Sequence, residues 1–79
     1  MGINEYTYSI VLDPDLEEGG YTVTVPALAG VITQGDTVEE AIAMAREAIQ
    51  CHIEGLLADG EPVPEETEPP KIVIVSVAA

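Results

Sequence analysis

One long amphipathic helix constrains this chain most, because the remaining segments must pack against the single apolar face that it provides. Thr37 and Glu40 have the spacing of a capping box, in which each side chain satisfies a free amide of the first helical turn. Gly60 is a suitable helix stop. Between these limits, apolar residues recur at spacings of three and four and form one stripe: Val38, Ala41, Ile42, Ala45, Ile49, Ile53, Leu56 and Leu57. The pattern predicts a helix of roughly six turns.

Segments that alternate between apolar and polar residues precede this helix. Residues 6–12 (YTYSIVL) and 21–26 (YTVTVP) both alternate, and turn-forming residues at 13–20 join them. They predict an antiparallel hairpin with one apolar face. Residues 31–33 favour a third short strand.

The segments after the helix differ sharply from each other. Residues 61–70 contain four prolines and four glutamates, which predicts an extended connector that does not pack. Residues 71–77 (KIVIVSV) are apolar on both faces, which is typical of a strand covered on both sides. A right-handed crossover would lay this strand parallel to the first strand. The predicted fold is α+β with the order β-β-(β)-α-β, a small and mainly antiparallel sheet backed by one helix.

The size of the chain points to association between copies. A chain of 79 residues forms one domain, residues 1–79, with a thin core worth roughly 3–5 kcal/mol. Its only cysteine, Cys51, cannot form an internal disulfide. One helix covers one face of the sheet, so the other face of the last strand needs a different cover. We therefore expect a homo-oligomer, either a dimer or a tetramer.

The charge balance narrows the possible partners. The chain has 2 basic and 15 acidic residues, a net charge of −13. Nucleic acid and anionic membranes are recognised by clustered Lys and Arg, so we expect no direct contact with either. An acidic protein instead attracts a cationic partner. The chain has no apolar run of the ~18 residues that a membrane span requires and no signal-peptide pattern, so we expect a cytoplasmic protein.

Residues suited to catalysis do not converge in this sequence. Cys51 and His52 are adjacent, and neighbouring helical residues point about 100° apart, so they cannot act together. A two-metal site needs carboxylates on rigid elements, yet the predicted strand interiors contain none. We expect no enzymatic activity, no metal site and no cofactor.

Several short motifs follow one another in a specific order along residues 6–77. The series is Pro26 at the end of a strand, Leu28-x-Gly30, Thr33-x-Gly35-Asp36-Thr37, Glu39-Glu40-Ala41, Glu47-Ala48 and Gly60-Glu61-Pro62-Val63-Pro64. In this order and spacing, the motifs resemble the core domain of HicB-type antitoxins and their short relatives. The resemblance implies a partial ribonuclease H-like fold without catalytic carboxylates.

The resemblance also implies a partner, a small basic HicA-type toxin that cleaves RNA and whose active surface the antitoxin covers. Charge complementarity between an acidic antitoxin and a cationic toxin surface fits this role. Longer family members continue into a C-terminal DNA-binding domain. Because this chain ends at Ala79, we expect no such domain here.

The candidate partner contacts are carboxylates expected on exposed turns and on the helix surface. They are Asp13, Asp15, Glu17, Glu18, Glu39, Glu47 and Glu54. A second set is expected to shape the turn and start the helix: Gly30, Gly35, Asp36, Thr37 and Glu40. The alternative to an antitoxin is a stand-alone oligomeric interaction module with no toxin partner.

Overall fold

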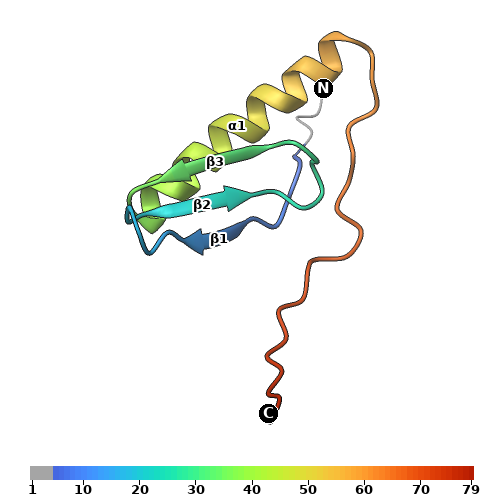
Figure 1. The fold of residues 1–79 in the computed structure, drawn as a ribbon. Coiled ribbons are helices and arrows are strands. Elements are labelled where there is room, and N and C mark those ends of the chain that lie inside the picture. The colour runs from blue at the N-terminus through green and yellow to red at the C-terminus, as the bar shows by residue number, and fades with distance from the viewer. Residues whose placement is uncertain (1–4) are drawn as a thin grey trace.

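A three-stranded sheet with one helix on one face forms the body of the protein (Figure 1). The computed structural model describes residues 5–79. The elements are β1 (Val11–Pro14), β2 (Tyr21–Thr24), β3 (Ile32–Gly35) and α1 (Val38–Ala58). The sheet order is β1-β2-β3, with both neighbouring pairs antiparallel. This arrangement confirms the predicted α+β class. Within the described residues, no helix combines the length and apolar character needed to cross a membrane.

The first strand begins later than the alternation predicts. Residues 6–10 carry no strand pairing, whereas Pro14, which was expected in the turn, pairs with β2. The reason is that β2 ends at Thr24, where the chain turns and the Leu28 amide donates to the Val25 carbonyl at 3.0 Å. Consequently β2 offers no backbone opposite residues 6–10. Pro14 is tolerated because β1 lies at the edge of the sheet.

The core lies where α1 crosses the sheet and the loop before β3. Its buried apolar residues are Val23, Val25, Leu28, Val31, Ala41, Ala45 and Ile53. Ala41 and Ala45 pack against Val23, and their small side chains let the helix approach the sheet closely. A Cβ atom on Gly35 would lie 2.6 Å from the Cα of Ala41. Of the two glycines expected to shape the turn, Gly30 has a positive φ of 88°, whereas Gly35 does not and is required because the close approach of α1 excludes a side chain.

The predicted last strand, residues 71–77, is not formed in the single chain. These residues have no strand pairing, and they project away from the body (Figure 1). The prediction was wrong for the isolated protomer because a strand needs a backbone partner, and this segment meets none within the described residues. The chain bends at Thr67 and Glu68, and Pro69 and Pro70 then favour an extended path outward.

The connector is partly packed, contrary to the prediction from its composition. The side chain of Glu66 accepts two hydrogen bonds at 2.8 Å, from the amide and the hydroxyl of Ser9. The Tyr8 hydroxyl donates to the carbonyl of Pro64. Val63 is half-buried. Glutamate and proline thus serve as attachment points, because carboxylate and carbonyl oxygens accept the hydrogen bonds that residues 8 and 9 donate.

Candidate protein-binding surface

The β1–β2 turn and the junction of β3 and α1 lie at the same end of the molecule (Figure 1). Both segments carry acidic residues, and Asp15, Glu18 and Asp36 line one shallow hollow there. Tyr21 pairs with Gly35 across the sheet, and Gly20 lies against the backbone of Gly35 and Asp36. We call this region the acidic end and define it by Asp13, Asp15, Glu17, Glu18, Asp36, Glu39 and Glu40. No Lys or Arg occurs among residues 5–45, so these charges are not neutralised by nearby sequence.

Asp15 builds the turn that presents its neighbours. Its Oδ1 atom accepts hydrogen bonds from the amides of Glu17 at 3.0 Å and Glu18 at 3.1 Å. Its own amide donates to the carbonyl of Gly20 at 2.9 Å. Such an Asx turn restricts the backbone of the two glutamates, whose side chains are exposed. The backbone of Glu17 and Glu18 is therefore already ordered, so a partner that binds there loses little conformational entropy in ordering it.

Glu47 and Glu54 lie apart from the acidic end. Both are exposed on α1, and with a rise of 1.5 Å per residue they lie about 12 Å and about 22 Å along the helix from Glu39. Glu54 accepts a hydrogen bond from the Gln50 side chain at 3.2 Å. The seven predicted contacts thus form one group of five and two separate helix positions.

Thr37 begins the helix in the position predicted for the N-cap. Its Oγ1 atom accepts from the amide of Glu40 at 3.1 Å, and its carbonyl accepts from the amide of Ala41 at 2.8 Å. The reciprocal bond of a capping box, from the Thr37 amide to the Glu40 carboxylate, is not among the hydrogen bonds of the described residues. The Glu40 side chain is exposed instead, where the helix dipole still favours its charge.

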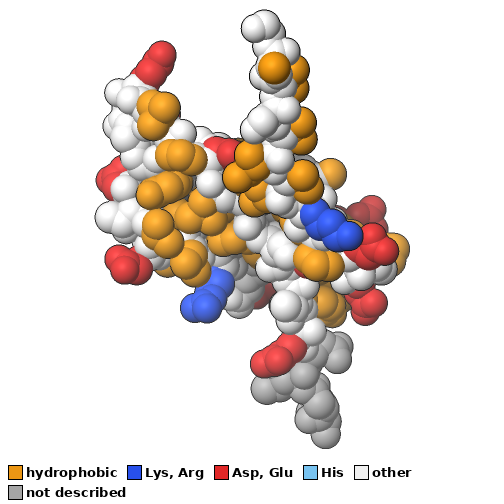
Figure 2. All heavy atoms as spheres, turned by 90° about the horizontal axis from the view of Figure 1, so that it is seen from below, with side chains coloured by type: hydrophobic (Ala, Val, Ile, Leu, Met, Phe, Trp, Pro, Cys, Tyr) orange, Lys and Arg blue, Asp and Glu red, His pale blue; other side chains and the backbone are white. Residues whose placement is uncertain are grey.

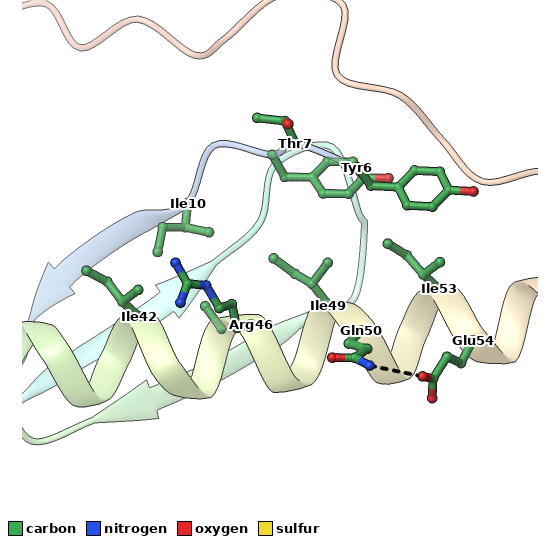
Figure 3. Close-up of a pocket in the computed structure, with 11 residues that line it drawn as sticks. Tyr6, Thr7, Ile10, Ile42, Arg46, Ile49, Gln50, Ile53 and Glu54 are labelled. Atoms are coloured by element: carbon green, nitrogen blue, oxygen red, sulfur yellow. Dashed lines mark hydrogen bonds between the residues drawn. The ribbon is translucent and has the colours of Figure 1, made fainter. Parts of the chain in front are cut away.

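A second feature is an apolar groove of about 560 Å³ between residues 6–10 and α1 (Figure 3). Its apolar lining includes Tyr6, Ile10, Ile42, Ile49 and Ile53. Part of the predicted core stripe therefore lines an open surface, because the short sheet does not extend over the whole helix. Ile42 remains 39% exposed and Leu57 remains 56% exposed. Sequence periodicity could not reveal the groove, since it shows which residues share a face but not what covers that face.

The aromatic side of the groove continues into the connector. Burial, followed by the nearby Tyr6 and the Glu65 carboxylate, raises the pKa of Tyr8 above its ordinary value of 10.0. The protonated phenol donates a hydrogen bond to the carbonyl of Pro64. Tyr8 thus holds the connector by a hydrogen bond. The alternation of residues 6–12 could not predict this contact, because the two partners lie far apart in the chain.

The other chemically versatile side chains are scattered. Cys51 is exposed on α1, and His52 beside it is half-buried. Among residues 5–79, no three His, Cys, Asp or Glu side chains come together in a way that could hold a metal ion. Within residues 5–79, the acidic end and the groove are therefore two surfaces that are suited to recognition.

Comparison with known proteins agrees with this arrangement. A family model described as "HicB_like antitoxin of bacterial toxin-antitoxin system" matches residues 8–74. A UPF0150 protein of Synechocystis is 48% identical over 61 residues, which cover 77% of this chain and 76% of the relative. A UPF0150 protein of Thermoplasma acidophilum is 42% identical over 59 residues, 75% of this chain and 84% of that protein.

A longer relative carries a functional name. Antitoxin HicB 1 of Photorhabdus laumondii is 42% identical over 62 residues, which cover 78% of this chain but only 39% of the relative. The family match spans the sheet, the helix, the connector and the first residues of the projecting segment 71–77. The chain therefore belongs to the HicB-like antitoxin family of bacterial toxin–antitoxin systems.

Proposed function

We propose that this protein is a non-catalytic antitoxin that binds and occludes a small, basic, RNA-cleaving toxin of the HicA type. Membership of the HicB-like antitoxin family supports the role. The observation that carries the choice of partner is the acidic end, where the turn at Asp15 holds Glu17 and Glu18 outward. Binding requires no cofactor and takes place in the cytoplasm, where an RNA-cleaving toxin would act.

Electrostatic complementarity explains how such a protein would neutralise its partner. A protein that cleaves RNA must offer cationic side chains to phosphates. The acidic end offers fixed carboxylates to the same side chains, so an antitoxin bound there competes with RNA. Complementary charge raises the association rate and disfavours neutral or acidic competitors. The same acidity keeps this domain away from nucleic acid.

Co-expression with a small basic protein, sought in the reading frame next to this one, tests the proposal. We expect co-purification of the two proteins and restoration of growth when the basic protein is toxic alone. A toxic partner that is neither bound nor neutralised would overturn the antitoxin role. The alternative, a stand-alone oligomeric interaction module, would then account better for the fold.

Charge reversal locates the contact surface. The double variant Glu17→Lys with Glu18→Lys should slow association with the toxin at least about tenfold at low salt, because long-range attraction is lost. A matched control is Glu61→Lys with Glu68→Lys, which makes the same charge change on exposed connector residues. If the control slows association equally, only net charge matters and the acidic end is not the binding surface.

A further inference from the structure

The two edges of the sheet differ in how they are closed. β1 and β3 are the outer strands, so each has one side without a strand partner within the described residues. On the β1 side, the amide of Ser9 shortly before the strand donates to Glu66, and Pro14 at the end of the strand has no amide hydrogen. Proteins use prolines and covering segments of this kind to prevent an edge strand from pairing with another chain.

β3 carries no comparable protection. Among residues 5–79, its backbone pairs only with β2, and no further backbone–backbone hydrogen bond involves residues 32–35. In an antiparallel pair, alternate residues direct their N–H and C=O groups away from the partner strand. β3 contains neither proline nor a charged residue, and its Ile32 and Gln34 are exposed. The outer side of β3 therefore offers the unpaired donors and acceptors that the addition of a further strand requires.

The helix adds side-chain contacts to this edge. α1 packs more closely on β3 than on β2, so one of its flanks borders the outer side of β3. Ile42 and Ile49 line the groove, which lies on the β1 side of the helix (Figure 3). With 3.6 residues per turn, the opposite flank carries Glu40, Met44 and Glu47, all of them exposed. We call these three residues the β3 flank. It offers two carboxylates around one apolar side chain.

The basic side chains of the protein lie on the other side of the molecule. Arg46 lines the groove, and Lys71 begins the projecting segment 71–77. Figure 2 views the molecule from the side of β1 and shows the basic side chains there in blue. The carboxylates that border β3 are Asp36, directly after the strand, and Glu40 and Glu47 on the β3 flank. No Lys or Arg of the described residues lies among them.

Charge and position together select the occupant of this edge. A second copy of the chain also carries a net charge of −13, so the two copies repel each other. Residues 71–77 of the same chain are kept on the β1 side, because Ser9 holds Glu66 of the connector by two hydrogen bonds. A basic extended segment of a partner is attracted instead, and its apolar side chains would cover Met44, which is 39% exposed.

We propose that the toxin binds by adding an extended basic segment of its own chain as a further strand along the free edge of β3. One set of its alternate side chains contacts the β3 flank. The other set lies beside Ile32 and Gln34, which point away from the core because Thr33 between them pairs with the buried Val23. This inference rests on the proposed antitoxin function and specifies how the partner is held.

Two lysine variants on opposite flanks of α1 test the location of the added strand. Met44 and Ile42 are each 39% exposed, but Met44 is on the β3 flank and Ile42 lines the groove. Met44→Lys places a like charge beside the basic segment, so it should weaken binding of the small basic toxin from co-expression at least about tenfold in titration calorimetry. Ile42→Lys should change the affinity less than about twofold. An equal loss in both variants would overturn the location.

A variant on the strand itself guards against damage to the helix. Ile32 is 66% exposed, so Ile32→Lys should leave the fold intact, and circular dichroism checks this for all three variants. Because lysine on an edge strand opposes pairing, Ile32→Lys should also weaken toxin binding at least about tenfold. Unchanged affinity in a folded Ile32→Lys variant would contradict the addition of a strand at β3.

Hydrogen exchange of the backbone amides tests the strand pairing directly. We expect the outward amides of residues 32–35 to exchange freely in the protein alone and to be protected in the toxin complex, while residues 11–13 change little. Protection of β1 instead of β3 would overturn the proposal. Protection of β3 that rises with the concentration of the protein alone would also overturn it, because a second copy would then occupy the edge. A toxin complex with unprotected β3 refutes only the strand addition, whereas the absence of any complex refutes the antitoxin function as well.

Discussion

Replacing Gly35 with alanine should destabilise the fold strongly, although the change adds one methyl group. The new Cβ would lie 2.6 Å from the Cα of Ala41 and 2.9 Å from the carbonyl carbon of Glu40. Both neighbours are backbone atoms of the first helical turn and cannot rotate away, so β3 and α1 must separate. Overpacking of this kind costs about 1–3 kcal/mol, and the backbone contact places Gly35→Ala at about 3 kcal/mol.

Gly55→Ala is a control with the opposite expected sign. Gly55 lies within α1, and a Cβ built there meets no atom within 4 Å. Alanine should therefore stabilise the helix by about 0.5–1 kcal/mol, because glycine is the poorer helix former. Urea unfolding followed by circular dichroism, at one fixed protein concentration, measures both variants. A Gly35→Ala stability within about 0.5 kcal/mol of wild type would refute the close approach of β3 and α1, since surface changes have effects of that size.

Two further predictions concern the helix cap and the phenol of Tyr8. Thr37→Ala should cost about 1 kcal/mol in the free energy of unfolding, because the amide of Glu40 loses its acceptor, while Thr37→Ser should remain close to wild type in urea unfolding. The pKa of Tyr8 is raised in the folded state, so the unfolded chain loses its phenolic proton first, and stability falls as the pH rises past about 10. Urea unfolding between about pH 8 and 11 should show this decline, and Tyr8→Phe should make it shallower; an unchanged slope would contradict the assignment.

Local patterns predicted the elements whose formation depends on neighbouring residues. The helix followed from its cap and its apolar spacing, because a threonine side chain reaches an amide three residues away in any chain. The hairpin followed from alternation around a turn rich in aspartate and glycine. Family membership was also predictable, since it rests on the order of short motifs rather than on contacts.

Other features depended on distances between segments far apart in the chain. Gly35 is required because β3 crosses α1, and Glu66 is half-buried because it meets Ser9, 57 positions earlier. Neither contact leaves a periodic signal. The same limit explains why β1 begins at Val11, since Val11 pairs with Thr24, the last residue of β2.

The sequence by itself determined the helix, the hairpin, the acidity and the family, because each depends on residue types and short spacings. The tertiary structure alone decided that five of the candidate carboxylates share one end, that an apolar groove opens between residues 6–10 and α1, and that residues 71–77 stay unpaired in the single chain. The physical reason is that periodicity assigns side chains to a face, whereas the cover on that face depends on how far each element extends. A strand-forming pattern states what residues 71–77 can become, and only the position of a partner edge decides where they do so.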